Sequence, residues 1–155
     1  MLFKKFFILV FLVLFSFSAT ANTPRSTGKY KNWESFTVQT DKGKICFAQT
    51  IPTKRAPASI KREKSKLFVT FRPSENIKDE VSMTSGHDYK SSTVTASSGK
   101  KRYSFFSQKN FAWLLDDQEE RSFIKLMKKA TNVIVKARTT KGAETTDHYS
   151  MMGFT

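Results

Sequence analysis

The chain has 155 residues, with 27 lysines and arginines, 13 aspartates and glutamates, and one cysteine. A single cysteine cannot form an internal disulfide, which excludes the small disulfide-stapled folds, and the length suits one domain with a real hydrophobic core. The formal charge of +14 attracts anionic lipid head groups, polyanionic polysaccharides or nucleic acids. Because no organised basic stripe is visible, a lysine-rich surface that maintains solubility is the favoured interpretation.

The N-terminus predicts a signal peptide over residues 1–21. A short basic start precedes the apolar run 6–17, and Ala19–Ala21 supplies the small-x-small pattern of a cleavage site. The run is shorter than the roughly 20 residues of a spanning helix, which disfavours a retained anchor. No cysteine follows closely enough for acylation. We expect a mature chain from Asn22, exported to the periplasm, the cell surface or the medium, with no stable membrane span and no cofactor.

The first third of the mature chain predicts a flexible lead-in and then a hairpin. Residues 22–32 are polar and include a proline and a glycine, which favours mobility. Residues 33–40 and 44–51 are rich in aromatic and β-branched side chains and flank the turn Asp41–Gly43. The single domain is therefore expected over residues 33–155.

A basic segment at residues 52–66 predicts a long exposed loop, because it contains two prolines and one acid among many cations. It could grip anions, or it could serve only as an extended connection between strands, which is the favoured interpretation. The candidate anion-binding residues are Lys54, Arg55, Lys61, Arg62, Lys64 and Lys66.

The remaining pattern predicts short strands and one helix. Strands are expected at residues 67–72, 80–84, 91–97, 100–107, 132–139 and 144–151. Asp116 and Asp117 offer N-cap oxygens, Glu119 and Glu120 occupy capping-box positions, and an amphipathic helix of about 117–129 follows. About eight strands and one helix make the fold mainly β, an antiparallel β-sandwich or flattened barrel with the helix across an opening.

The sequence predicts no catalytic, cofactor-binding or metal site. His87 and His148 lie far apart and outside any ligand-spaced cluster. Helix capping explains the acids at residues 116–120 better than acid–base or calcium chemistry does. Cys46 lacks a neighbouring base, so we expect it in the core or with a partner missing from this chain. A pocket that joined a histidine to carboxylates would favour an enzyme.

Aromatic residues also raise the possibility of a base-stacking surface. Phe105, Phe106, Phe111 and Trp113 alternate with lysines and an arginine, as in single-strand nucleic-acid sites. The alternative is that these rings fill the core while the cations face water. Residues 111–115 are continuously apolar, which favours the core, and export argues against a nucleic-acid partner.

Several segments together resemble the invasion-associated locus B family of exported proteobacterial proteins, and the resemblance covers residues 33–154. The segments are Trp33, Cys46, Asp79–Met83, Gly99–Lys101 with Phe105–Phe106, Phe111–Trp113, Lys128–Thr139, Gly142 and Thr146–Phe154. The resemblance implies a β-rich periplasmic or surface domain without transferable catalytic residues. Founding members are linked to host-cell invasion. Relatives continue past Gly153–Phe154 with a tail that often carries a cysteine, so we expect that this chain is truncated.

Two functional hypotheses follow. The first is a non-enzymatic envelope protein that acts by surface interaction with an envelope or surface component. The second is a cationic module for anionic glycans or lipid head groups, for which the charge of the segment 52–66 is the reason.

Overall fold

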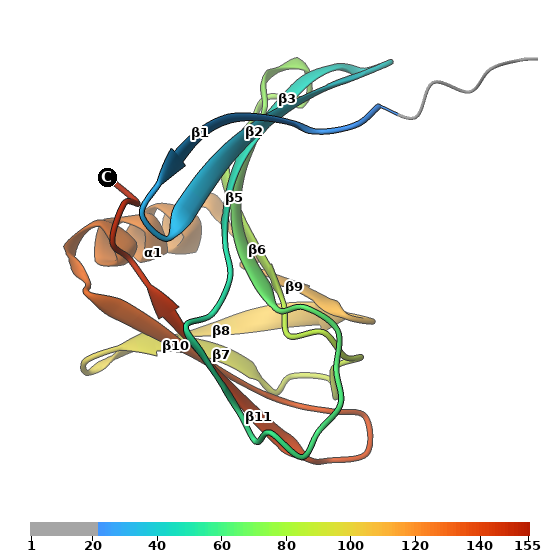
Figure 1. Ribbon diagram of the computed structural model, residues 1–155, viewed down its shortest axis with the longest axis vertical. Coiled ribbons are helices and arrows are strands. Elements are labelled where there is room, and N and C mark those ends of the chain that lie inside the picture. Colours follow the sequence, from blue (N-terminus) through green and yellow to red (C-terminus); the bar gives the residue numbers. More distant parts are fainter. Residues whose placement is uncertain (1–21) are drawn as a thin grey trace, which may run out of the picture.

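The computed structural model describes residues 22–155, so the predicted signal peptide lies outside the described residues (Figure 1). All strands of the described part pair antiparallel in one sheet, in the order β1-β2-β3-β5-β6-β9-β8-β7-β10-β11-β4. The strands are β1 Arg25–Tyr30, β2 Trp33–Thr40, β3 Gly43–Thr50, β4 Lys54–Ala56, β5 Lys66–Arg72, β6 Ile77–Thr84, β7 Val94–Ser98, β8 Lys101–Gln108, β9 Phe111–Trp113, β10 Asn132–Arg138 and β11 Glu144–Ser150. The sheet is not closed, and the prediction of a mainly β fold is confirmed.

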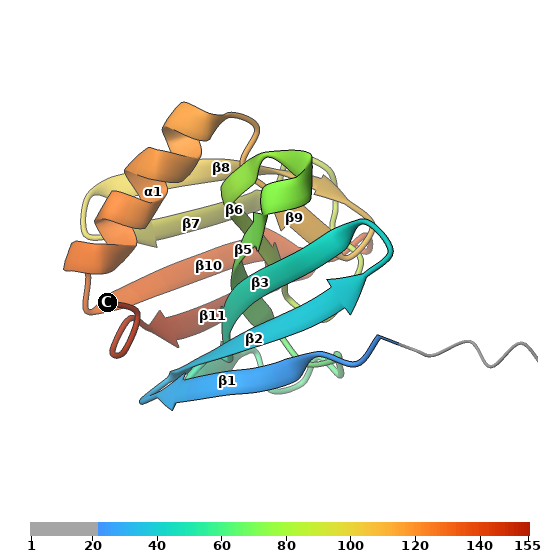
Figure 2. The ribbon, with the colours of Figure 1, turned by 90° about the horizontal axis from the view of Figure 1, so that it is seen from above.

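The sheet bends so that its two halves lie across one another. In Figure 1 the strands β1–β3 lie above β7, β8, β10 and β11, and Figure 2 shows the same halves from above with α1 (Asp117–Lys129) beside them. Strands β5 and β6 run between the halves. The hydrophobic core fills the space enclosed by this bend and includes Val69, Met83, Phe105 and Val135.

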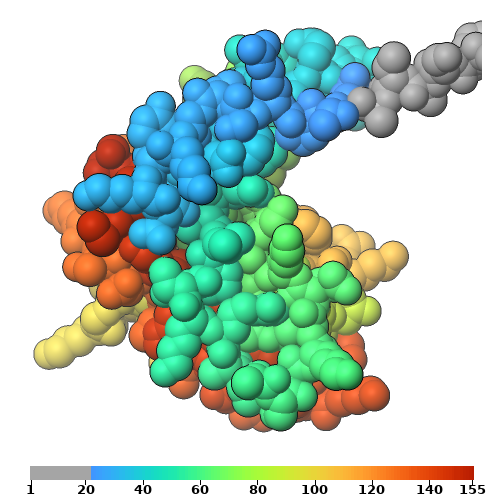
Figure 3. Space-filling model, in the orientation of Figure 1, coloured from blue at the N-terminus to red at the C-terminus, as the bar shows by residue number. Residues whose placement is uncertain are grey.

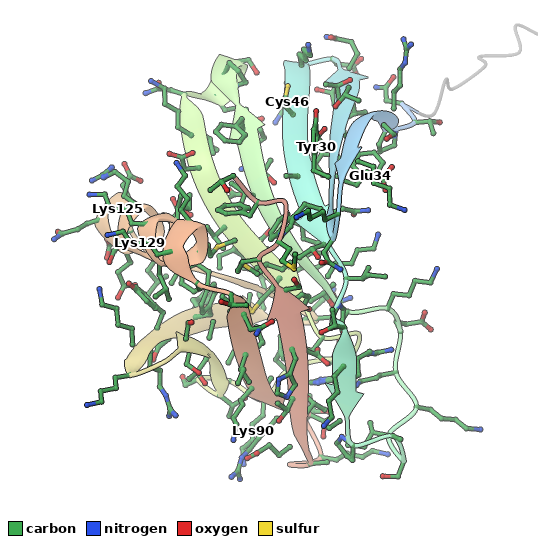
Figure 4. All side chains as sticks on the ribbon, turned by 60° about the vertical axis from the view of Figure 1, so that its left-hand side comes forward. Tyr30, Glu34, Cys46, Lys90, Lys125 and Lys129 are labelled. Carbon is green, nitrogen blue, oxygen red and sulfur yellow. The ribbon has the colours of Figure 1, made fainter. Side chains whose placement is uncertain are left out.

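The helix forms where its local signals place it. Asp116 Oδ1 accepts a hydrogen bond from the N–H of Glu119 at 2.8 Å, which satisfies one of the N–H groups left open at a helix start. Phe123 and Met127 are buried in the core, whereas Lys125 and Lys129 point away from the sheet (Figure 4). The predicted cap and amphipathic face are confirmed.

The predicted strands are confirmed with small shifts at their ends. The hairpin β2–β3 pairs in register from Trp33↔Thr50 to Thr40↔Gly43, and β10–β11 pair from Asn132↔Ser150 to Arg138↔Glu144. Gly43 has a φ of 118°, a conformation that glycine adopts without steric cost. Strand β6 is longer than predicted because it begins at Ile77.

Two predictions about connecting segments are wrong. The lead-in 22–32 contains β1, which pairs with β2 over Arg25–Tyr30. The segment 52–66 is not wholly exposed, because β4 pairs with β11 and Ser65 is buried. Both strands lie at an edge of the sheet, where main-chain hydrogen bonds hold a strand without apolar alternation.

Candidate functional site

A row of aromatic side chains crosses the outer face of the sheet. Strand residues alternate between faces, and on β5, β6 and β9 the buried alternates are Val69, Val81 and Ala112. Their neighbours on the opposite face include Phe68 and Trp113, which are only half-buried. The aromatic row consists of Phe36, Phe47, Phe68, Phe111 and Trp113.

Each ring of the aromatic row contacts the next. The centroids of Phe36 and Phe47, which pair across β2 and β3, are 5.1 Å apart with the rings stacked. Phe47 meets Phe68 at 6.2 Å, Phe68 meets Phe111 across β6 at 6.3 Å, and Phe111 stacks on Trp113 at 6.0 Å. These separations lie in the range of favourable ring pairs. The row is therefore a continuous apolar surface rather than scattered exposed residues.

Two hydroxyl groups lie among the rings. Ser82 pairs with Phe68 on one side and with Trp113 on the other, so its side chain lies between two members of the aromatic row. Ser82 is 7 % exposed. Within residues 22–155, neither its hydroxyl nor that of Thr70 makes a hydrogen bond. Both hydroxyls are therefore available to water or to a ligand.

A shallow groove contains these groups. It encloses about 360 Å³ and is lined by Phe47, Phe68, Thr70, Arg72, Glu80, Ser82, Phe111 and Trp113. At one side Arg72 donates to both oxygens of Glu80, at 3.0 and 2.5 Å. This bidentate geometry fixes both side chains. We call this the aromatic groove.

An acidic pocket adjoins the aromatic groove, and Glu80 and Trp113 line both. It encloses about 520 Å³ between β6 and the start of α1. Its carboxylates are Asp79, Glu80, Asp116, Asp117 and Glu120. Five of the 13 acids of a basic protein thus gather here, which makes the local field unlike that of the whole molecule.

Glu120 is the buried member of the acidic pocket. It is 8 % exposed, and its Oε1 accepts a hydrogen bond from the N–H of Val81 at 3.1 Å. Burial raises the pKa of Glu120 above its ordinary value, against the lowering effect of that hydrogen bond, and neighbouring carboxylates add to the rise. In the described part of the chain no group of His, Cys, Asp and Glu has the geometry to hold a metal ion.

The cations of the basic segment 52–66 lie in different environments. Lys54, Lys61 and Lys64 are exposed, and the segment lies on the surface shown at the lower centre of Figure 3. Arg62 does not belong to an exposed anion site, because its side chain is 2 % exposed and paired with Asp147 at 2.7 Å. Sequence alternation could not reveal a partner 85 positions away.

The other two members of the predicted anion site also have contacts. Arg55 lies 3.9 Å from Asp147 and donates to the carbonyl of Glu63. Lys66 holds its ammonium group 5.9 Å from the ring centre of Phe68, beside the aromatic row. The six candidate cations therefore do not form one cluster.

The histidines do not form an accessible catalytic site. His87 Nδ1 donates to the carbonyl oxygen of Asp88 at 3.0 Å, and Nε2 lies 2.9 Å from the hydroxyl oxygen of Thr145, which also donates to the carbonyl of Ala137 at 3.4 Å. A hydroxyl bonded to an imidazole is the geometry of an activated nucleophile. However, Thr145 is 1 % exposed, and neither residue lines the groove or the acidic pocket. His148 lies on β11, half-buried and paired with Ile134 and Lys54.

The sequence interpretation of the aromatic residues is partly wrong. Phe105 is buried as expected, but Phe106 is 52 % exposed, and Phe111 and Trp113 stand on the outer face. All five residues of 111–115 are apolar, but only Ala112 and Leu114 face the core, and their neighbours do not. The alternation was present in the sequence, but which face was buried was not.

Cys46 and Phe154, which the sequence also singled out, both lie within the fold. Cys46 is half-buried on β3, where it pairs with Phe71 and is a free thiol. Phe154 packs on Trp33 with ring centres 4.7 Å apart. Both rings line a third pocket, of about 270 Å³, together with Tyr30 and Glu34, which lie near each other in Figure 4.

Comparison of the chain with models of protein families, with curated proteins and with solved structures finds no match. Among the described residues, no helix has the length and apolar character needed to cross a membrane.

Proposed function

We propose that the protein is a non-enzymatic, exported envelope protein that acts by binding a partner through its aromatic row. The observation that carries the proposal is the row itself, in which five contacting rings stand half-exposed on the outer face of the sheet. Interfaces and ligand sites are enriched in such rings, because each presents a large, stiff apolar surface at low entropic cost. Export rests on the signal-like segment 1–21 and on the resemblance to the locus B family.

The geometry of the polar residues supports binding rather than catalysis. The hydroxyls of the aromatic groove, Thr70 and Ser82, have no base among the groove-lining residues except the carboxylate of Glu80, and Arg72 already holds that carboxylate. The hydroxyl–imidazole pair of Thr145 and His87 is closed to substrate by burial. Neither arrangement offers the accessible nucleophile and base that a hydrolase needs.

A sedimentation assay tests this proposal. The protein expressed from the full sequence is mixed with envelope fragments from its source cells. Binding of this parent protein is compared with that of the double variant F68A/W113A and of F71A. Phe71 is 38 % exposed and lies outside the aromatic row, so it controls for the loss of an exposed ring. Binding by the parent and by F71A, but not by the double variant, is expected. Equal binding by all three would overturn the proposal, as would turnover of an envelope polymer abolished by one polar substitution.

A second function, binding of anionic glycans or lipid head groups, has a narrower basis. Lys54, Lys61 and Lys64 are exposed near one edge of the sheet. The test is the variant K61E/K64E, which leaves the buried Arg62 intact. Salt-sensitive binding to vesicles with anionic lipid, lost in this variant, is the expected outcome for this function. Binding that persists in the variant or ignores salt would contradict it.

A further inference from the structure

We infer that the ligand of the aromatic groove is an uncharged polysaccharide chain. This inference rests on the proposed function, because it names the ligand class for the same face. Three features of the groove carry it: ring faces beside unpartnered hydroxyls, a local excess of carboxylates, and the length of the row.

The first feature is the mixture of apolar and hydrogen-bonding groups. The faces of aromatic rings carry partial negative charge and attract polarised C–H groups, and a sugar ring presents such groups on its flat side. The same sugar carries hydroxyls around its edge. Ser82 and Thr70 offer hydroxyls that have no partner within residues 22–155, and Ser82, a residue 7 % exposed, lies between Phe68 and Trp113. An acyl chain would cover the rings but leave these hydroxyls without partners, at a cost in free energy.

The second feature is the charge near the groove. The protein as a whole is basic, but at the groove Lys66 lies beside Phe68 and Arg72 is neutralised by Glu80. The adjoining pocket adds four further carboxylates, Asp79, Asp116, Asp117 and Glu120, against Lys78 and Arg121. Such a field repels phosphate and sulfate groups. It does not repel a neutral sugar, whose hydroxyls can donate hydrogen bonds to carboxylate oxygens. Nucleic acids and acidic glycans are therefore the less suitable occupants.

The third feature is length. The row passes from β2 across β3, β5 and β6 to β9. Four steps between neighbouring strands span roughly 20 Å. The rings are 5.1 to 6.3 Å apart, so successive rings can contact successive sugar units of one extended chain. A single sugar would use only part of this surface.

Calorimetric titration of the protein expressed from the full sequence tests the inference. The probes are cellohexaose, laminarihexaose and chitohexaose, together with the neutral glycan fraction of protease-treated, delipidated envelopes. At least one of these is expected to bind, and its hexamer should bind more tightly than its dimer. F68A and W113A should each weaken binding about tenfold, and S82A about threefold. F71A should bind as the parent does, and matching near-ultraviolet circular dichroism should show that the variants are folded.

The outcomes separate this inference from the proposed function. If envelope fragments bind through Phe68 and Trp113 but none of the neutral glycan probes does, the glycan inference is overturned and the proposed function stands. If envelope binding does not depend on these rings, both fail. Tighter binding of alginate oligomers or oligothymidylate than of every neutral probe, through the same rings, would also overturn the inference.

Discussion

Arg62 and Asp147 form a bidentate ion pair inside the protein, although 85 positions separate them in the chain. The two guanidinium nitrogens of Arg62 lie 2.9 and 2.7 Å from the two carboxylate oxygens of Asp147. Both side chains are almost fully buried, at 2 % and 1 % exposure. Arg62 also donates to the carbonyl of Ser85 and to Ser65 Oγ. The pair thus fastens the segment between β4 and β5 to the last strand of the sheet.

Asp147→Ala should lower the free energy of unfolding by about 3–5 kcal/mol, because it leaves the Arg62 guanidinium buried and unpaired. The double variant R62M/D147L should lose less than this, since it leaves no buried charge. Denaturant unfolding measures both. Glu144→Ala is the matched control on the same strand, because Glu144 pairs with Lys136 and Arg138 at about half exposure and should cost at most about 1 kcal/mol. An equal loss in D147A and E144A would show that the buried pair has no special structural role.

The burial of Glu120 predicts a pH dependence of stability. Its pKa is raised in the folded protein, chiefly by burial, so the folded state holds this proton to higher pH than the unfolded state does. The resulting contribution to stability is present below the unfolded pKa and is lost as the pH rises through the folded value. Glu120→Gln keeps an oxygen acceptor for the N–H of Val81 but does not titrate.

Unfolding by denaturant at a series of pH values checks this prediction. Relative to the parent, E120Q should gain stability from acidic to neutral pH and then level off above the folded pKa of Glu120. Gln in place of the half-buried Glu119 provides the control for the loss of a carboxyl group from the same helical turn. A flat difference between E120Q and the parent from pH 3 to pH 8 would mean that burial does not shift this carboxyl group.

The C-terminal turn requires glycine at position 153. Gly153 has a φ of 92°, and a Cβ there would lie 1.9 Å from the carbonyl oxygen of Tyr30. Gly153→Ala should therefore detach the last residues from β1 and expose Trp33, which packs against Phe154. Gly142→Ala is a matched control, because its φ is 89° but nothing lies within 4 Å of the added carbon.

Both glycine variants should lose about 1 kcal/mol for the left-handed backbone. Only G153A should also shift tryptophan emission to longer wavelength, which fluorescence of the folded protein in a W113F background measures. The same emission in G153A and G142A would contradict the close contact between the terminal turn and β1.

Phe123 joins the helix to the sheet. It is fully buried, with its ring centre 5.0 Å from that of Tyr103 and 5.5 Å from that of Phe105. Phe123→Ala should lower the free energy of unfolding by about 3–5 kcal/mol through lost burial and the cavity left behind. Phe106→Ala should cost much less, because Phe106 is 52 % exposed. Calorimetric melting checks the order, and a larger loss in F106A would mean that the two faces of β8 are misassigned.

Local chemistry made the helix and the central hairpins predictable. The N-cap at Asp116 and the helical spacing of Phe123 and Met127 involve residues close together in the sequence. The same is true of the turn that ends at Gly43. The edge strands β1 and β4 escaped prediction because main-chain pairing, rather than side-chain pattern, holds them. A polar sequence carries no signal for that pairing.

The sequence by itself determined that the protein is strongly basic and rich in phenylalanine, and that the side chains of its strands alternate between two faces. It did not determine which face is buried. Burial depends on how a bent sheet encloses its core, and this arrangement sends Ala112 inward and Phe111 and Trp113 outward. It also removes Arg62 from solvent by bringing Asp147 to it. Tertiary structure decided both the aromatic row and the removal of Arg62 from the expected anion site, because each depends on contacts between segments far apart in the chain.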